Sequence, residues 1–276
     1  MQSSINKIAV VGTGVIGTGW IIRFLFNKKQ IKIFDPSEKQ KKFLLDELKR
    51  TAPLLKKFYK SNININNQLE FCSSIKAAVS DADLIQENTP ENEKLKIRIT
   101  KEISHHSKKT AIIASSSSGL LPSRIQSKAQ HPERVLIAHP FNPVYLIPLV
   151  ELVGHVKTTE KASKILMQLG MFPLTVRKEI DAHIADRLLE AVWREGLWLI
   201  NDGIATTEEI DDAIRYGFGL RWAQMGMFET YRIAGGDDGL EHFIEQFGPA
   251  LKWPWTKLTD VPELSCLLYT SPSPRD

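Results

Sequence analysis

Short apolar segments alternate with longer amphipathic stretches over the N-terminal part of the chain. The apolar segments lie at 7–11, 31–35, 83–87, 110–115, 134–139, 148–153 and 171–176. Continuous apolar runs of this length are typical of buried β-strands. Because helical stretches separate most of them, we expect a parallel, doubly wound sheet. Residues 1–180 are therefore predicted to form an α/β domain.

The pattern changes at about residue 181, beyond which the chain shows helical periodicity and no convincing strand. The helix expected from about His183 to Ile200 is apolar on two sides, and such a helix is buried on two sides. It is either the centre of its own domain or a subunit contact, and we expect a homodimer. One side carries Ile184, Leu188, Ala191, Val192 and Leu199, and the other carries Leu189, Trp193, Leu197 and Ile200. We predict an all-α domain over residues 181–264, followed by a non-native tail at 265–276.

Composition limits the class of protein. Hydrophobic residues make up 42% of the 276 residues and charged residues 25%, which is typical of globular proteins. The net charge of +4 gives no reason to expect nucleic acid as a partner. Cys72 and Cys266 lie too far apart to suggest a disulfide framework or a zinc site, so no metal is predicted. With no apolar run of about 20 residues and no leader, we expect no membrane association and a cytoplasmic location.

A glycine-rich motif joins the first predicted strand to the next helix. GTGVIG at 12–17 has the G-x-G-x-x-G spacing, and Asp35 ends the second predicted strand about 20 residues further on. Gly12 allows the tight turn, Gly14 lets the backbone approach a pyrophosphate, and Gly17 allows close helix–strand packing. The helix N-terminus favours phosphate. We therefore predict a Rossmann-type domain whose cofactor-binding residues include Gly12, Gly14, Val15, Ile16, Gly17 and Asp35.

The identity of the cofactor depends on Asp35. A carboxylate accepts hydrogen bonds from ribose hydroxyls but repels a 2′-phosphate, and residues 36–38 offer no Arg to receive one. NAD is therefore favoured over NADP.

Three further polar residues are candidates for catalysis. His139 ends a predicted strand, where ligands bind in such folds, Glu151 lies in the next strand, and Ser118 ends a run of serines. A His with a carboxylate partner can exchange a proton with a substrate hydroxyl. Spacing alone leaves open whether these residues are catalytic or structural.

Several motifs carry a resemblance to a known family. GTGVIG, LIQENTPEN, SSSSGL and AHPFNPVYLIPLVELV, together with the two-domain layout, resemble the 3-hydroxyacyl-CoA dehydrogenase family from about residue 5 to residue 260. The resemblance implies an NAD-dependent dehydrogenase in which His139 is the general acid/base and Glu151 orients and polarises it. It also implies that Ser118 hydrogen-bonds the substrate oxygen, and Glu87 is added to the expected cofactor-binding residues.

One position departs from that family. Members that act on acyl-CoA usually carry Asn at the start of the long helix, whereas this chain has Asp186. A carboxylate near the substrate favours a cationic substrate. The alternative is that Asp186 only caps the helix.

The helical half is rich in aromatic side chains, which bind quaternary ammonium groups by cation–π attraction. Segments 193–236 and 251–258 resemble family members that oxidise a small 3-hydroxy acid bearing a trimethylammonium group, and such a substrate is the leading hypothesis. Any single ring is as readily part of a core. The aromatic residues are Trp193, Trp198, Trp222, Phe228, Tyr231, Trp253 and Trp255. The predicted substrate-contacting residues are Ser118, Phe141, Asp186 and Trp193.

Two alternatives stay open. The first is another 3-hydroxyacid or L-3-hydroxyacyl-CoA dehydrogenase, for which the Lys-rich stretch 39–60 could bind the phosphates of CoA. The second is a non-catalytic, crystallin-like NAD-binding protein. The presence of Ser118, His139 and Glu151 together speaks against the second.

Overall fold

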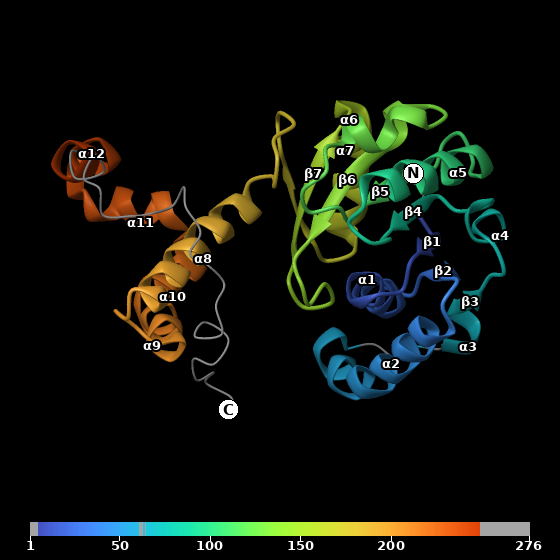
Figure 1. Cartoon of the computed structure of the whole chain (residues 1–276), viewed down its shortest axis with the longest axis horizontal. Coiled ribbons are helices and arrows are strands. Elements are labelled where there is room, and N and C mark those ends of the chain that lie inside the picture. The colour runs from blue at the N-terminus through green and yellow to red at the C-terminus, as the bar shows by residue number, and fades with distance from the viewer. Residues whose placement is uncertain (1–4, 61–62, 64, 249–276) are drawn as a thin grey trace. The chain divides into compact units, whose positions relative to one another are not determined.

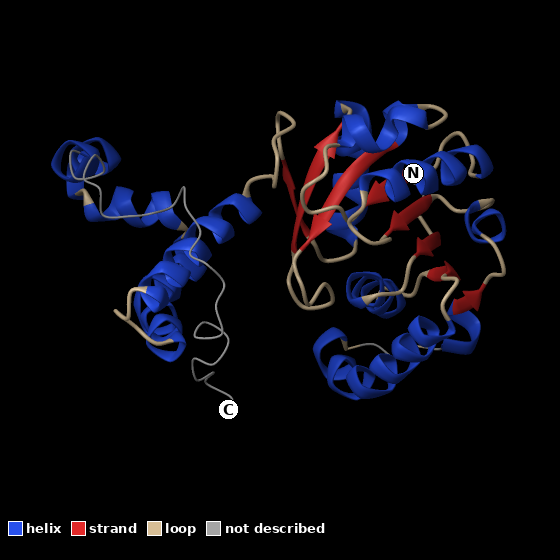
Figure 2. Ribbon diagram, in the orientation of Figure 1, coloured by secondary structure: helices blue, strands red, loops and turns tan. Residues whose placement is uncertain are grey.

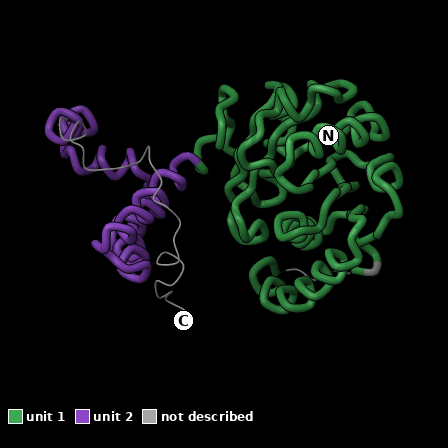
Figure 3. The backbone as a smooth tube through the Cα atoms, viewed as in Figure 1, with its two compact units in different colours: residues 1–186 green, residues 187–276 purple. Residues whose placement is uncertain are grey.

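The computed structural model describes residues 5–60, 63 and 65–248. The chain divides into two compact units, residues 1–186 and 187–276 (Figure 3). The division lies a few residues beyond the position 180/181 predicted from the sequence. The tail predicted at 265–276 lies outside the described residues, as do Trp253 and Trp255.

The first unit is built on an eight-stranded sheet of order β3-β2-β1-β4-β5-β6-β7-β8 (Figures 1 and 2). The neighbours of β1 are β2 on one side and β4 on the other, so the strand order reverses there, and ligands bind at such a switch point. The predicted Rossmann-type sheet followed by a helical region is confirmed. The strands are β1 Lys7–Val11, β2 Gln30–Phe34, β3 Leu69–Phe71, β4 Leu84–Glu87, β5 Ile112–Ser115, β6 Val135–Pro140, β7 Leu149–Gly154 and β8 Phe172–Thr175.

The sheet differs from the prediction in two places. β3 has no counterpart among the predicted strands, because its three residues are partly or fully exposed and form no apolar run. The sheet is also not wholly parallel, since β7 runs antiparallel to β6. Residues 141–148 return the chain without the helical crossover that a parallel connection needs.

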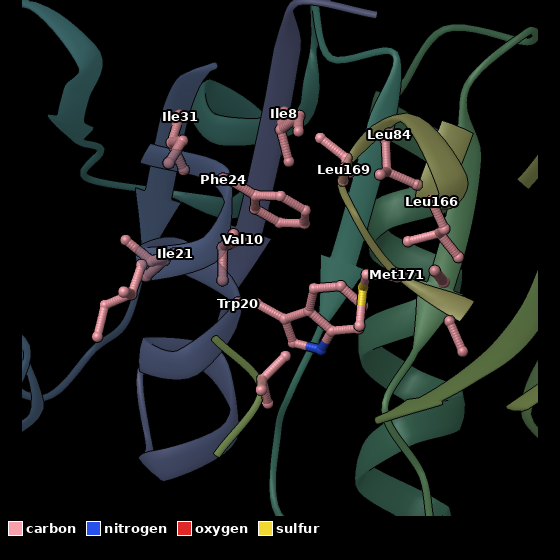
Figure 4. Packing of buried hydrophobic residues seen from close by; sticks show 14 of the residues in the cluster. Ile8, Val10, Trp20, Ile21, Phe24, Ile31, Leu84, Leu166, Leu169 and Met171 are labelled. Carbon is pink, nitrogen blue, oxygen red and sulfur yellow. The ribbon is translucent and has the colours of Figure 1, made fainter. Parts of the chain in front are cut away.

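Helices cover both faces of this sheet. Alternate residues along β1 point to opposite faces, so Ile8 and Val10 belong to one apolar cluster and Ala9 and Val11 to the other. The first cluster is formed with α1, α2 and α7 and includes the stacked rings of Trp20 and Phe24 (Figure 4). The second is formed with α4 and α5. The helices of this unit are α1 Val15–Phe26, α2 Glu38–Tyr59, α3 Ile65–Gln68, α4 Ile75–Val79, α5 Glu93–His106, α6 Pro122–Ile125 and α7 Val156–Gln168, with short 3-10 turns at Gln126–Lys128 and Pro132–Arg134.

A buried arginine links α1 to the β6–β7 connection and to the segment before β8. Arg23 is 3% exposed, and within the part of the chain that the structure describes its side chain donates to four backbone carbonyls. Its Nε lies 2.7 Å from the oxygen of Val144 and its Nη2 lies 3.2 Å from that of Ile147, both in the β6–β7 connection. Its Nη1 donates to Leu169 and Gly170 before β8. Burial lowers the pKa of Arg23.

The described part of the second unit is helical. Its helices are α8 Ala185–Asn201, α9 Thr207–Asp212, a π-helical turn Ala213–Phe218, α10 Gly219–Met225, α11 Met227–Ala234, a 3-10 turn Gly236–Asp238 and α12 Gly239–Phe247. Helix α8 begins at Ala185 rather than at His183, because Ala182 and His183 both have positive φ. Among residues 187–248, no large hydrophobic side chain is buried. None of the helices in the described part of the chain could cross a membrane.

Candidate active site

The glycine motif forms the turn between β1 and α1. Gly12 has a φ of +91°, and a Cβ there would lie 2.7 Å from the carbonyl oxygen of Asn88, so a side chain is excluded. A Cβ on Gly17 would lie 2.0 Å from the oxygen of Gly12. By contrast, a Cβ on Gly14 would meet nothing within 4 Å. The open side of this turn is therefore at Gly14, where an approaching pyrophosphate would need the space.

The N-terminus of α1 suits an anion. The N-cap residue of this helix is Gly14, which has no side chain to accept hydrogen bonds from the first amides. Val15 is 56% exposed and Ile16 is half-buried, and both lie in this first turn. The turn thus fits the phosphates of a dinucleotide.

Asp35 directly follows β2 and contacts the same turn. Its Oδ2 accepts hydrogen bonds from the amide of Thr13 at 2.7 Å and from the Thr13 hydroxyl at 3.0 Å. Its Oδ1 accepts from the amide of Ser37 at 2.9 Å. A carboxylate can accept about four hydrogen bonds, so capacity for a ribose hydroxyl remains. The contact of Asp35 with ribose stays a prediction.

Glu87 ends β4 beside the glycine turn, but its carboxylate is enclosed by protein donors. It is fully buried and pairs with Lys96, whose Nζ lies 3.1 Å from Oε2 and is itself 1% exposed. The amide and hydroxyl of Thr89 and the hydroxyl of Ser115 also donate to it. Its predicted contact with the cofactor remains untested, and the observed contacts give it a role in holding the ends of β4 and β5 together.

Glu91 also links these strand ends and was not among the predicted site residues. It accepts hydrogen bonds from the hydroxyl of Ser117 and, at 3.1 Å, from the amide of Gly119. Burial acts to raise the pKa of Glu91, but the hydrogen bonds and the nearby Lys96 outweigh it and the pKa is lowered. The second Glu of LIQENTPEN was the sequence signal for this position.

The antiparallel register of β6 and β7 pairs His139 directly with Glu151. The Nδ1 atom of His139 lies 3.2 Å from Oε2 of Glu151, and both side chains are buried. The other carboxylate oxygen, Oε1, accepts from the amides of Ile184 and Ala185, each at 2.8 Å. Burial acts to raise the pKa of Glu151, but the hydrogen bonds from His139 and these amides lower it overall. Glu151 is thus an ionised partner that fixes the imidazole.

Asp186 approaches the other nitrogen of the same imidazole. Its Oδ2 lies 3.6 Å from Nε2 of His139, and its side chain is 20% exposed. It stands in the first turn of α8, within the first compact unit, so an acidic residue also suits the helix N-terminus there. The imidazole of His139 therefore lies between two carboxylates.

The remaining predicted residues are distributed over both units. Ser118 is exposed in the loop after β5. The ring of Phe141 packs edge-on against the imidazole of His139, with 5.2 Å between centroids. Trp193 lies on α8 in the second unit and is 58% exposed. Among the described residues, no cluster of His, Cys, Asp or Glu side chains could hold a metal ion.

Two family models match the chain. The model for the NAD-binding domain of 3-hydroxyacyl-CoA dehydrogenase matches residues 7–179, and the model for the C-terminal domain of the same enzyme matches residues 183–262.

Curated relatives are similar over nearly the whole chain. An L-carnitine dehydrogenase/betainyl-CoA thioesterase of Agrobacterium fabrum is 55% identical over 94% of this chain, which spans 54% of that protein. L-carnitine dehydrogenases of Mesorhizobium japonicum and Bacillus cereus are 51% and 52% identical over 96% of the chain, which spans 74% and 82% of them. The chain is thus about half the length of the bifunctional relative.

Solved structures show the same fold. An NAD+-dependent 5-formyl-3-hydroxy-2-methylpyridine 4-carboxylic acid 5-dehydrogenase superposes with a TM-score of 0.79 at 25% identity, covering 88% of this chain and 79% of that one. The 3-hydroxyacyl-CoA dehydrogenase of Archaeoglobus fulgidus superposes with a TM-score of 0.66 at 21% identity, covering 88% and 81%.

Proposed function

Since the chain belongs to the 3-hydroxyacyl-CoA dehydrogenase family, we propose that it oxidises the 3-hydroxyl group of L-carnitine to 3-dehydrocarnitine with NAD. The observation that carries this proposal is the placement of His139 between Glu151 and Asp186. The first carboxylate prepares the imidazole to accept a proton. The second offers a negative charge to a cationic substrate.

Glu151 determines which nitrogen of His139 acts as the base. An ionised carboxylate only accepts hydrogen bonds, so the hydrogen shared across the 3.2 Å contact belongs to Nδ1 of His139. The lone pair of the neutral imidazole is then on Nε2, which can take the proton of the substrate hydroxyl. When bound, NAD supplies the acceptor for the hydride that leaves the carbinol carbon.

The protein prepares this step in two further ways. Glu151 and Asp186 stabilise the imidazolium that forms on His139, because both carboxylates lie beside it. The distance of 3.6 Å between Asp186 and Nε2 exceeds a hydrogen bond, so Nε2 is not already engaged by that carboxylate. In keeping with the family resemblance, Ser118 hydrogen-bonds the substrate oxygen.

NAD fits the cradle formed by the glycine turn. Gly12 and Gly17 admit no side chain, the position of Gly14 is open, and the first turn of α1 is uncapped. Asp35 holds the turn through Thr13 and would accept the hydroxyls of the adenosine ribose. A 2′-phosphate would face the same carboxylate, so NAD is preferred over NADP.

Asp186 gives selectivity for the cationic end of L-carnitine. In this substrate a single methylene separates the carbinol carbon from the quaternary nitrogen. A carboxylate beside the base that takes the hydroxyl proton is therefore within reach of the trimethylammonium group. The ring of Phe141, which packs on His139, adds an aromatic surface that can attract the same group. The predicted contribution of Trp193 belongs to this proposal as well.

The second unit supports a homodimer. Its described hydrophobic side chains are not buried within the unit, and Leu189 and Trp193 on α8 are 54% and 58% exposed. A cavity of about 320 Å³ lies between α8 and the segment formed by α9 and the π-helical turn, lined largely by aliphatic side chains. An apolar face of this kind needs a partner, and we propose a second copy of the chain. The cytoplasmic location stays a prediction.

An NAD-reduction assay with three alternative substrates, each measured separately, tests the proposed function. The purified protein is given L-carnitine, 3-hydroxybutyrate or 3-hydroxybutyryl-CoA, with His139→Ala as the control for background reduction. We expect the highest kcat/KM with L-carnitine. A higher value with the CoA thioester would replace this proposal with an acyl-CoA dehydrogenase, and no reduction with any substrate would favour a non-catalytic NAD-binding protein.

A further inference from the structure

The segment between β8 and α8 has a strained backbone beside the catalytic pair. Ala182 and His183 have φ values of 60° and 53°, in the left-handed region that residues with a Cβ rarely occupy. Two consecutive residues keep this conformation only where the surrounding contacts hold them. The contacts made by these and the next residues therefore show what the turn is for.

This turn contacts both halves of the catalytic apparatus. Immediately after it, the amides of Ile184 and Ala185 donate to Oε1 of Glu151, each at 2.8 Å. Within it, Nε2 of His183 lies 3.3 Å from the carbonyl oxygen of Ser117, the residue before Ser118. A single turn thus connects the carboxylate that holds the base to the loop that carries the serine.

The chemistry of His183 differs from that of His139. His183 is fully buried, and the two imidazole rings lie 5.5 Å apart. Because a carbonyl only accepts hydrogen bonds, Nε2 of His183 carries the hydrogen, and Nδ1 is left as a buried acceptor that finds no partner among the described residues. A buried acceptor without a hydrogen bond costs free energy, and a buried phenyl ring at this position would avoid that cost.

The surroundings keep His183 neutral. Burial lowers its pKa most, and the charge that His139 can carry lowers it further. The hydrogen bond to Ser117 and the carboxylates of Glu151 and Asp186 act in the opposite sense and do not prevail. The lowered pKa favours the neutral form of His183, which carries its hydrogen on Nε2.

We propose that His183 is a positioning residue, whose Nε2–H bond to Ser117 locks the left-handed turn and thereby fixes Glu151 and the loop of Ser118 around His139. This role deepens the proposed function and rests on it, because the effect is read from the turnover of L-carnitine. In this role His183 contacts neither the substrate nor the cofactor.

Two variants distinguish the effect of losing the hydrogen bond to Ser117 from the effect of changing the shape of the side chain. His183→Phe fills the same volume without a donor. His183→Gln carries an N–H group the same number of bonds from the backbone and can donate to Ser117. Both replace the residue in the same strained conformation. His155→Phe, at an exposed position before α7, is the control for loss of a histidine elsewhere.

We expect His183→Phe to lower kcat about tenfold to a hundredfold, since small displacements of catalytic groups have effects of this size, with little change in KM for NAD. His183→Gln should recover most of this loss, and His155→Phe should match the wild type. Retained NADH binding, measured by fluorescence, shows that the variants are folded. Wild-type kcat in His183→Phe, or equal losses in Phe and Gln variants that both bind NADH, would overturn the proposal.

Nitrogen NMR of the imidazole supplies a readout that needs no turnover, with the signals of His183 assigned from their loss in His183→Gln. We expect a neutral ring with hydrogen on Nε2 at neutral pH, and a pKa below the ordinary value for histidine. A ring that takes up a proton near its ordinary pKa of about 6.5 would overturn the role of His183. If the wild type does not oxidise L-carnitine, the proposed function fails, and this spectrum alone then decides whether His183 is the neutral donor that positions the turn.

Discussion

Oδ2 of Asp186 lies 3.6 Å from Nε2 of His139, the imidazole nitrogen that faces away from Glu151. This contact places a negative charge beside the atom that is proposed to receive the hydroxyl proton. Under the proposed function, this one carboxylate would both stabilise the imidazolium and select a cationic substrate.

The first prediction concerns substrate charge. Asp186→Asn should raise the KM for L-carnitine roughly tenfold or more, equivalent to about 1.4 kcal/mol of lost attraction. The KM for a neutral analogue with a tert-butyl group in place of trimethylammonium should change little, because it gains nothing from the carboxylate. Steady-state kinetics with both substrates provide the measurement. Equal kinetics of the wild type on the two compounds would contradict recognition by charge.

The second prediction concerns the base. His139→Ala should lower kcat by about 10²–10⁴-fold, the usual contribution of general acid–base catalysis, while NADH still binds. Glu151→Gln should have a comparable or milder effect, since it removes the charge that holds Nδ1 but leaves the base. Turnover and NADH fluorescence are measured on the same preparations. Near-normal turnover in His139→Ala would show that the proton leaves by another group.

The third prediction concerns pH and follows from the lowered pKa of Glu151. In the unfolded chain this carboxyl has an ordinary pKa of about 4.3, so below that pH the unfolded state binds more protons than the folded state. Ionised Glu151 therefore contributes to the free energy of unfolding at pH values above its unfolded pKa, and this contribution is lost as the pH falls through its lower, folded pKa. Urea unfolding of Glu151→Gln should show a smaller loss of stability between neutral and acid pH than the wild type. An identical pH dependence would contradict this linkage.

The fourth prediction concerns the choice of cofactor. Asp35→Ala should weaken NAD binding roughly tenfold to a hundredfold, as expected for lost hydrogen bonds to a charged acceptor, and should narrow the preference over NADP. Because Asp35 also holds Thr13, the matched control is Thr13→Val, which loses the hydroxyl contact but keeps the amide. The control should keep the preference for NAD. Equal kcat/KM for both cofactors in the wild type would refute the assignment.

The fifth prediction concerns assembly. Replacing Trp193 and Leu197 on α8 with Asp and Lys should convert the proposed homodimer to monomers, because charges cannot be buried against a second apolar face. Leu54→Lys, at a 74% exposed position on α2, is the control and should remain dimeric. Sedimentation velocity at micromolar concentration distinguishes the species. A monomeric wild type would argue against the dimer.

Much of the first unit was predictable because local patterns determine it. The glycine turn and most strands are continuous motifs, and the His139–Glu151 pair was inferred from a family resemblance. The features that were missed depend on tertiary contacts. Lys96 belongs to a class of side chain that is usually solvated, yet it is buried because Glu87 neutralises it. The left-handed φ of His183, because of which α8 begins at Ala185, could not be predicted from the helical periodicity of the sequence.

The fastening of α1 by Arg23 limits how this protein can be recombined with others. The helix that begins at the cofactor turn is tied at its other end to backbone carbonyls in the β6–β7 connection and before β8. A chimera that exchanged only residues 7–35 with a distant dehydrogenase would break those bonds and leave buried carbonyls without donors. The nucleotide-binding unit of this chain is therefore not an interchangeable module, and it must be exchanged together with residues 141–148 and 169–170.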